Sequence, residues 1–157
     1  MSNEEADLLI EIAKRMRKNL LELPEPGHKE FYKAVSLADT KKFTIQMFRG
    51  NSRRDKYQIA LLYKKNFVLM RVDTGATGIH YNTDKSIIPP NTPHLHYYDE
   101  HISHENKCHD AIVLPDRFTN PADAIQLLQD FLKYINIIDM AEIQIIQQGG
   151  LPYGQHK

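Results

Sequence analysis

The stretch NTPHLHYYDEHISHENKCHDAIVLP, residues 91–115, contains five of the eight histidines of this chain. An imidazole changes its charge near neutral pH and is also the commonest metal ligand in proteins. A cluster of imidazoles can therefore serve as an acid–base site, as a metal site, or as a solvated surface that binds a partner. The secondary structure that positions these side chains helps to choose among the three kinds of site.

The segment HLHYYDE has the alternation of a strand. In a strand, residues two apart share a face, so His94, His96, Tyr98 and Glu100 are expected on one side and Leu95 on the other. Because Leu95 is apolar and suited to the core, we expect both histidines on the open face of a sheet.

A preceding strand, FVLMRVD, carries Arg71, and His80 follows it in the connection to the histidine strand. If the two strands pair, Arg71 lies close to the histidines. Metal-free cleavage of RNA needs only such parts: His80 and His96 as the acid–base pair, Arg71 as the phosphate clamp, and His94 and Tyr98 in support. This hypothesis requires no cofactor.

A metal site is the competing hypothesis. HLHYYDE reads His-x-His-x3-Glu and resembles part of the first metal-binding motif of cupins, so His94, His96 and Glu100 would bind zinc or iron. The glycines that flank that motif are missing, and no downstream stretch matches the second cupin motif.

Basic side chains near a predicted hairpin tip offer a local surface for RNA, namely Arg53, Arg54 and Lys56. A local surface is required because 20 basic and 20 acidic residues balance, which leaves no long-range field to attract nucleic acid. Cys108 lies between Lys107 and His109, and nearby positive charge would favour a reactive thiolate, but a cysteine at the start of a strand is more often an inert buried residue.

The periodicity of the chain predicts an α+β fold. Apolar residues three and four apart indicate a helix over residues 3–23, and a second helical stripe covers 120–136. Between them, short runs with period two indicate about five antiparallel strands over 40–115, interrupted by a long loop at 74–93. Residues 147–157 contain several glycines and are expected to form a loosely held tail. We expect a single domain with its helices on one face of the sheet.

The expected cellular location follows from the targeting and membrane signals that the sequence does not show. Its N-terminus does not have the pattern of a signal peptide, no stretch approaches the length of a membrane span, and Cys108 is the lone cysteine. We therefore expect a cytoplasmic protein with no membrane contact.

The sequence resembles a family of small bacterial and phage proteins of unknown function over about residues 40–150. The matching features are Arg-x-Asp at 71–73, His80, PHLHYYDE at 93–100, AIVLPDRF and the helix ending DFLKYINI. The resemblance implies that Lys107 corresponds to a lysine that follows the histidine pair in relatives. It also implies a bacterial or phage context, which favours a toxin-like ribonuclease and, as the alternative, a non-enzymatic protein that binds and inhibits a protein partner.

Overall fold

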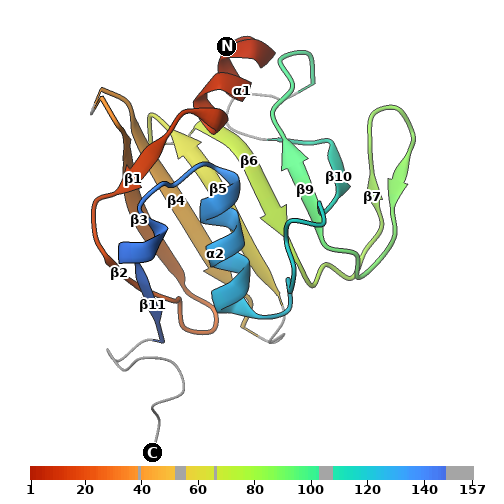
Figure 1. Ribbon diagram of the computed structural model, residues 1–157. Helices are drawn as coiled ribbons and strands as arrows, with labels where there is room; N and C mark the ends of the chain where they lie inside the picture. Colours follow the sequence, from red (N-terminus) through yellow and green to blue (C-terminus); the bar gives the residue numbers. More distant parts are fainter. Residues whose placement is uncertain (39, 52–55, 66, 103–107, 148–157) are drawn as a thin grey trace, which may run out of the picture.

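One antiparallel sheet of seven strands organises the molecule, in the order β1-β3-β4-β5-β6-β9-β10 (Figure 1). The computed structural model describes residues 1–38, 40–51, 56–65, 67–102 and 108–147. The strands of this sheet are β1 (Lys14–Met16), β3 (Lys29–Ser36), β4 (Lys42–Arg49), β5 (Tyr57–Tyr63), β6 (Phe67–Asp73), β9 (His94–Tyr97) and β10 (Ala111–Val113). The α+β class predicted from the sequence is confirmed.

Helix α2 (Ala124–Tyr134) lies across one face of this sheet, and α1 (Asn3–Glu11) lies at one end of it (Figure 1). The Asp123 side chain caps α2 by accepting hydrogen bonds from the backbone N–H groups of Ile125 and Gln126. The helix therefore begins later than the predicted residue 120. Its apolar stripe, with Leu128 and Phe131 fully buried, packs on the sheet to form the core.

The N-terminal helix is much shorter than predicted. Ser2 caps it as the sequence indicated, since its Oγ accepts a hydrogen bond of 3.1 Å from the N–H of Glu5. The helix nevertheless ends at Glu11 rather than near residue 23, because residues 14–16 pair with β3 and bury Lys14 and Met16 on either side of an exposed Arg15. The apolar residues of this segment are three and four residues apart, which predicted a helix instead of this short strand.

Two strands of the main sheet, β1 and β3, were missed, which is why about five were expected and seven are found. Two further short strands form a small parallel pair: β2 (Leu20–Glu22) with β11 (Gln144–Ile146). A one-turn 3-10 helix (Met140–Glu142) precedes β11. Most of the predicted loose tail, residues 148–157, lies outside the described residues.

The predicted long loop at 74–93 contains a small hairpin. Strands β7 (His80–Tyr81) and β8 (Ile87–Ile88) pair within it. The hairpin is held against β10, because Asn82 exchanges two hydrogen bonds with the backbone of Ala111 and Thr83 donates two to the Asp110 carboxylate. The turn-forming residues of this segment are thus anchored by side-chain contacts that periodicity does not reveal.

None of the helices in the described part of the chain is long and apolar enough to span a membrane.

Phe131→Ala is expected to lower the free energy of unfolding by about 3–5 kcal/mol, because the ring is 0% exposed among core residues and its removal leaves a cavity. Chemical denaturation monitored by circular dichroism measures the change. Leu8→Ala is the matched control, since Leu8 is 57% exposed on α1. An equally small effect of both substitutions would contradict the position of α2.

Candidate metal centre

Strands β6 and β9 pair so that Arg71 lies opposite His96 and Asp73 lies opposite His94. Cross-strand partners share a face, so these four side chains gather on one side of the sheet. Leu95, between the two histidines, points to the other side and joins the core beneath α2. The pairing that would bring Arg71 to the histidines is therefore confirmed.

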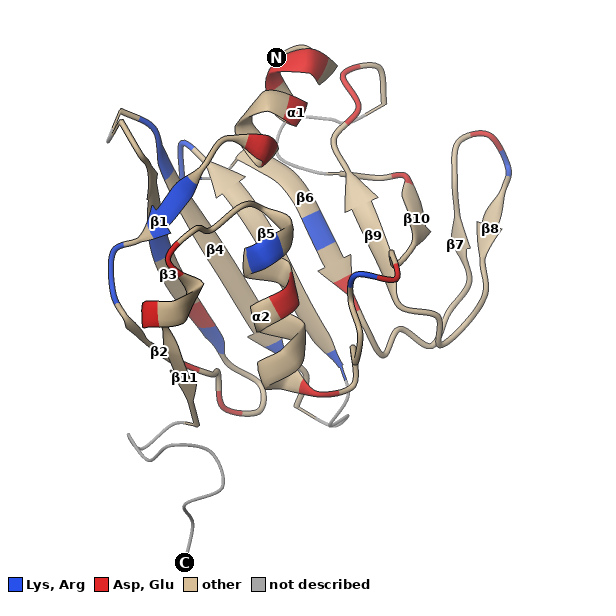
Figure 2. Cartoon of the chain, viewed as in Figure 1, with Lys and Arg blue, Asp and Glu red and all other residues tan. Residues whose placement is uncertain are grey.

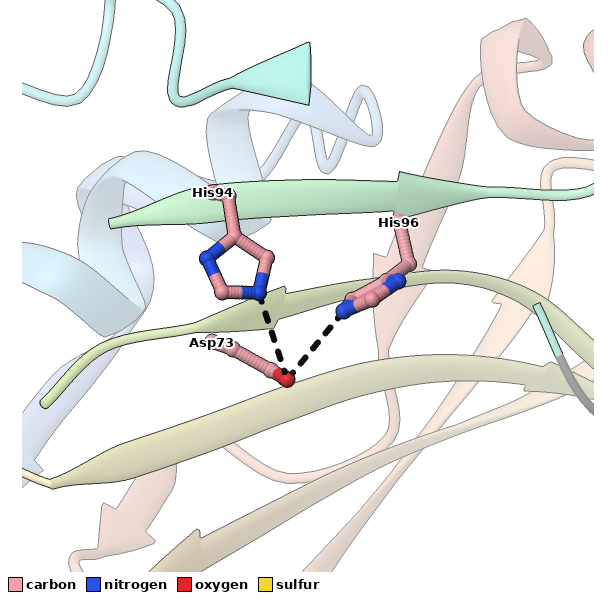
Figure 3. Close-up of side chains that lie close together, drawn as sticks. All are labelled: Asp73, His94 and His96. Atoms are coloured by element: carbon pink, nitrogen blue, oxygen red, sulfur yellow. Dashed lines mark ion pairs between the residues drawn. The ribbon is translucent and has the colours of Figure 1, made fainter. Parts of the chain in front are cut away.

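Three potential ligand atoms converge at this point. The Asp73 Oδ2 atom lies 3.3 Å from His96 Nε2 and 3.7 Å from His94 Nε2, and Figure 3 shows both rings directed from β9 toward this carboxylate. All three atoms lie within 4.8 Å of one another. Ligands of a tetrahedral zinc ion, at bond lengths of about 2.0–2.1 Å, are about 3.3 Å apart, so the spacing fits a metal with modest contraction.

The far side of each ring is held by the backbone. His94 Nδ1 lies 2.9 Å from the carbonyl oxygen of Thr92, and His96 Nδ1 lies 2.8 Å from that of His109. A carbonyl can only accept a hydrogen bond, so each Nδ1 carries the proton. A ring that is also protonated at Nε2 donates to Asp73 from that atom, and without this proton Nε2 has a lone pair directed at the same carboxylate. Such a carbonyl partner fixes metal-ligating histidines in the same way.

The Asp73 carboxylate is ionised. Burial alone would raise its pKa, but hydrogen bonds from His96 and Arg71 and the charges of both groups lower the pKa to about 2. Arg71 makes two bonds to it, from Nε to Oδ1 at 2.7 Å and from an Nη to Oδ2 at 2.9 Å. Without the Nε2 protons, two lone pairs and a carboxylate would face one point, where a bound cation can replace the proton that His96 donates.

His80 extends the cluster from strand β7. Its ring centroid lies 4.9 Å from that of His96 and 5.8 Å from that of His94. His80 Nε2 is buried and has no hydrogen-bond partner among the described residues. Burial lowers the pKa of His80, and the neighbouring His96, His94 and His109 lower it further. A neutral ring with an unused nitrogen is available as a further ligand.

The cluster lies at the wall of a cavity of about 440 Å³. Arg71, Cys108 and His109 line it, together with His80 and the segment before it. The two strand histidines are only 5% and 3% exposed, so the predicted open face is in fact covered. This burial arises because the connection after β6 returns over the sheet, which the strand pattern alone could not indicate.

Two predicted site residues lie elsewhere. Strand β9 ends at Tyr97, so the alternation does not continue: the Tyr98 hydroxyl donates to the carbonyl oxygen of Met1, and Glu100 Oε2 accepts from the N–H of Asn3. Glu100 therefore does not complete the metal set, and Asp73 takes that position. Tyr98 supports the N-terminal segment instead of the histidines.

Of the remaining candidates, Lys56 and Cys108 belong to the described residues. Lys56 is described but does not line the histidine cavity, whereas Arg53, Arg54 and Lys107 lie outside the described residues. Cys108 lines the cavity as a thiol: its Sγ donates to the carbonyl oxygen of Val68 at 3.2 Å, and burial raises its pKa to about 12. Both features favour an inert thiol over a thiolate nucleophile at Cys108.

Sequence reasoning missed two contributors. Asp73 was visible as the second residue of Arg-x-Asp, at the spacing that places it beside Arg71, but it was not included in the ligand set. The backbone carbonyl of His109 carries no sequence signal, because any residue at that position supplies the same oxygen.

Comparison with known proteins identifies a family but no characterised relative. No curated protein and no solved structure matches the chain. The sequence model of a family of unknown function, DUF6978, matches residues 1–137, which is most of the 157 residues and includes the whole histidine cluster. This agrees with the resemblance to an uncharacterised family seen in the sequence, and the chain belongs to the DUF6978 family.

Proposed function

We propose that this protein binds one divalent transition metal ion, zinc or iron, through Asp73, His94 and His96, and uses it to hydrolyse a small anionic substrate. The observation that supports the proposal most strongly is the convergence of two Nε2 atoms and an ionised carboxylate oxygen. Two imidazoles with one carboxylate form a ligand set used for zinc and for non-haem iron.

His80 is the best candidate for a further ligand or for a group that moves a proton. Its unused, buried Nε2 faces a polar cluster, and the lowered pKa keeps the ring neutral, as either role requires. The hydrogen bonds of Asn82 and Thr83 to the β10 region hold this ring in place. Removal of His80 should weaken the site less than removal of His96, because His80 is not one of the three converging ligands.

The cavity suggests the substrate class. About 440 Å³ suits a small molecule, and Arg71, whose side chain is 33% exposed, provides a guanidinium at the wall. Guanidinium groups bind carboxylate and phosphate oxygens. When bound, the metal would supply a water whose pKa is lowered to about 7, which is a nucleophile at neutral pH. A phosphate or carboxylate ester is the substrate class that fits both features.

Metal-free ribonuclease activity is the second candidate. His80 and Arg71 line the same cavity, as an RNA-cleaving site would need. We rank it below the metal site because both ring nitrogens of His96 already face protein groups, the His109 carbonyl and Asp73. An acid–base residue needs one nitrogen directed at the substrate. The cytoplasmic location, the bacterial or phage origin and a protein partner remain predictions from the sequence.

Protein purified without a histidine tag is expected to contain close to one equivalent of zinc or iron, measured by inductively coupled plasma mass spectrometry. After chelation, one equivalent should rebind with release of protons. The metal proposal fails if neither native nor reconstituted protein retains either ion. RNA cleavage that persists in excess chelator and is lost in His80→Ala would favour the metal-free ribonuclease instead.

A further inference from the structure

A second cavity, of about 680 Å³, lies at the ends of strands β3, β4 and β5, away from the histidines. Its lining includes six basic side chains: Arg17, Lys33, Lys41, Lys42, Lys64 and Lys65. No carboxylate belongs to the described residues that line it. Figure 2 shows basic segments on β1, on the connection that follows it and near the ends of the adjacent strands.

These cations are not neutralised within the described part of the chain. None of the six takes part in an ion pair there. Lys33 Nζ donates to Thr44 Oγ1 at 3.0 Å, and Lys64 Nζ lies 5.5 Å from the centroid of the Tyr63 ring. Six cations without an ion-pair partner among the described residues thus surround one cavity of a chain that is neutral as a whole, and a bound polyanion would relieve their mutual repulsion.

The turn between β5 and β6 supports a binding role. Lys64 and Lys65 have φ angles of 52° and 72°, in the left-handed region that favours glycine and asparagine. The chain thus places two lysines where other residues would form the turn with less strain. A turn with these residues contributes two charges to the rim of the cavity.

The floor of the cavity is apolar. Ala34, Phe43 and Tyr63 line it; Tyr63 is the half-buried one of the three, and the Phe43 ring, 2% exposed, packs behind it with ring centroids 5.5 Å apart. A cavity of this size falls within the range of about 300–1,000 Å³ that is usual for sites of small ligands and cofactors. An apolar floor under a basic rim matches a molecule with a flat apolar part and several phosphate groups.

We propose that this cavity, the basic cavity, binds a nucleoside polyphosphate, with its phosphates at the lysine rim and its base on the apolar floor. A free nucleotide fits better than a nucleic acid strand because the cations surround one bounded cavity and the neutral chain offers no general attraction for a strand. No residue lines both the basic cavity and the histidine cavity, so this site is independent of the proposed metal centre.

Isothermal titration with ATP, in the presence of chelator and at low ionic strength, tests the proposal. We expect saturable binding with one site per chain, and weaker binding as salt screens the lysines. ATP should bind more tightly than inorganic triphosphate, because only ATP contacts the apolar floor. The double variant Lys64→Gln and Lys65→Gln should lower the ATP affinity at least tenfold while melting like the wild type.

The matched control is the double variant Lys85→Gln and Lys133→Gln, which removes the same charge from two other exposed sites. It should bind ATP like the wild type, as should Asp73→Asn. If both double variants lowered the ATP affinity equally, the affinity would depend only on the total charge of the protein. That result would overturn the site. Absence of saturable ATP binding also overturns it, and so does tight binding of a single-stranded RNA without binding of ATP.

Discussion

His96→Ala is expected to lower the affinity for zinc at least a hundredfold relative to the wild-type protein. The substitution removes one of the three converging atoms and leaves Asp73 Oδ2 with one imidazole, 3.7 Å away. Loss of groups that merely orient metal ligands typically lowers affinity 10- to 100-fold, so loss of a ligand should reach or exceed the upper end. Competition with a chromophoric chelator at pH 7.5 measures this affinity.

Asp73→Asn separates charge from shape at the same site. It retains an oxygen in a side chain of the same size but removes the negative charge, so it should also weaken zinc binding strongly. His101→Ala is the control for generic loss of an imidazole, because that side chain is 78% exposed and contacts Glu100. Zinc affinity that is unchanged in His96→Ala and Asp73→Asn would show that any bound metal is held elsewhere.

Lys14→Met is expected to lower the free energy of unfolding by roughly 3–5 kcal/mol, because buried acceptors without donors cost about 1–3 kcal/mol each. Lys14 is 0% exposed, and its Nζ donates to the carbonyl oxygens of Ile10, Ile12 and Ile135 at 2.7, 3.0 and 2.7 Å. Methionine fills a similar volume but cannot donate. Urea denaturation at pH 7 measures the loss.

The surroundings of Lys14 act on its charge in opposite directions. Burial lowers the pKa of Lys14 to about 7, while the three carbonyl oxygens oppose that shift because a neutral amine has only two N–H groups. The ring of Phe43, 4.9 Å from Nζ, also favours the cation. Lys29→Met, at an exposed position on β3, is the control. Equal stability of the two variants would mean that the three bonds contribute nothing net.

The parts of the fold that could be predicted are those in which local pattern and final environment agree. Strands β4, β5 and β6 alternate or are apolar throughout and are joined by short connections, and α2 carries a wide apolar stripe. The segment 12–23 could not be predicted because its apolar residues fit a helical spacing as well as a strand. Its partners, β3 and β11, decide between the two, and no local signal identifies those partners.

The site residues that could be predicted are likewise those whose position depends on local pattern. Arg71, His94 and His96 were placed together because strand alternation and one assumed pairing suffice to do so, and His80 was added because it lies on the connection between the two strands. Tyr98 and Glu100 were misplaced because the strand ends at Tyr97, after which the chain turns toward the N-terminus. The end of a strand depends on the neighbouring strand, which in this case is β10, only three residues long.

The parallel pairing of β2 with β11 constrains when the chain can finish folding during its synthesis. Leu21 and Ile146, both buried, belong to these strands, and the N–H of Leu23 donates to the carbonyl oxygen of Ile146. Lys14 likewise needs Ile135, which is 121 residues further along the chain. At about 5–20 residues per second, the ribosome requires about 6–24 s to make that stretch. For that interval β2 lacks its partner strand and Lys14 lacks one of its acceptors, so a ribosome that stalls before α2 leaves these residues accessible to chaperones or to other nascent chains.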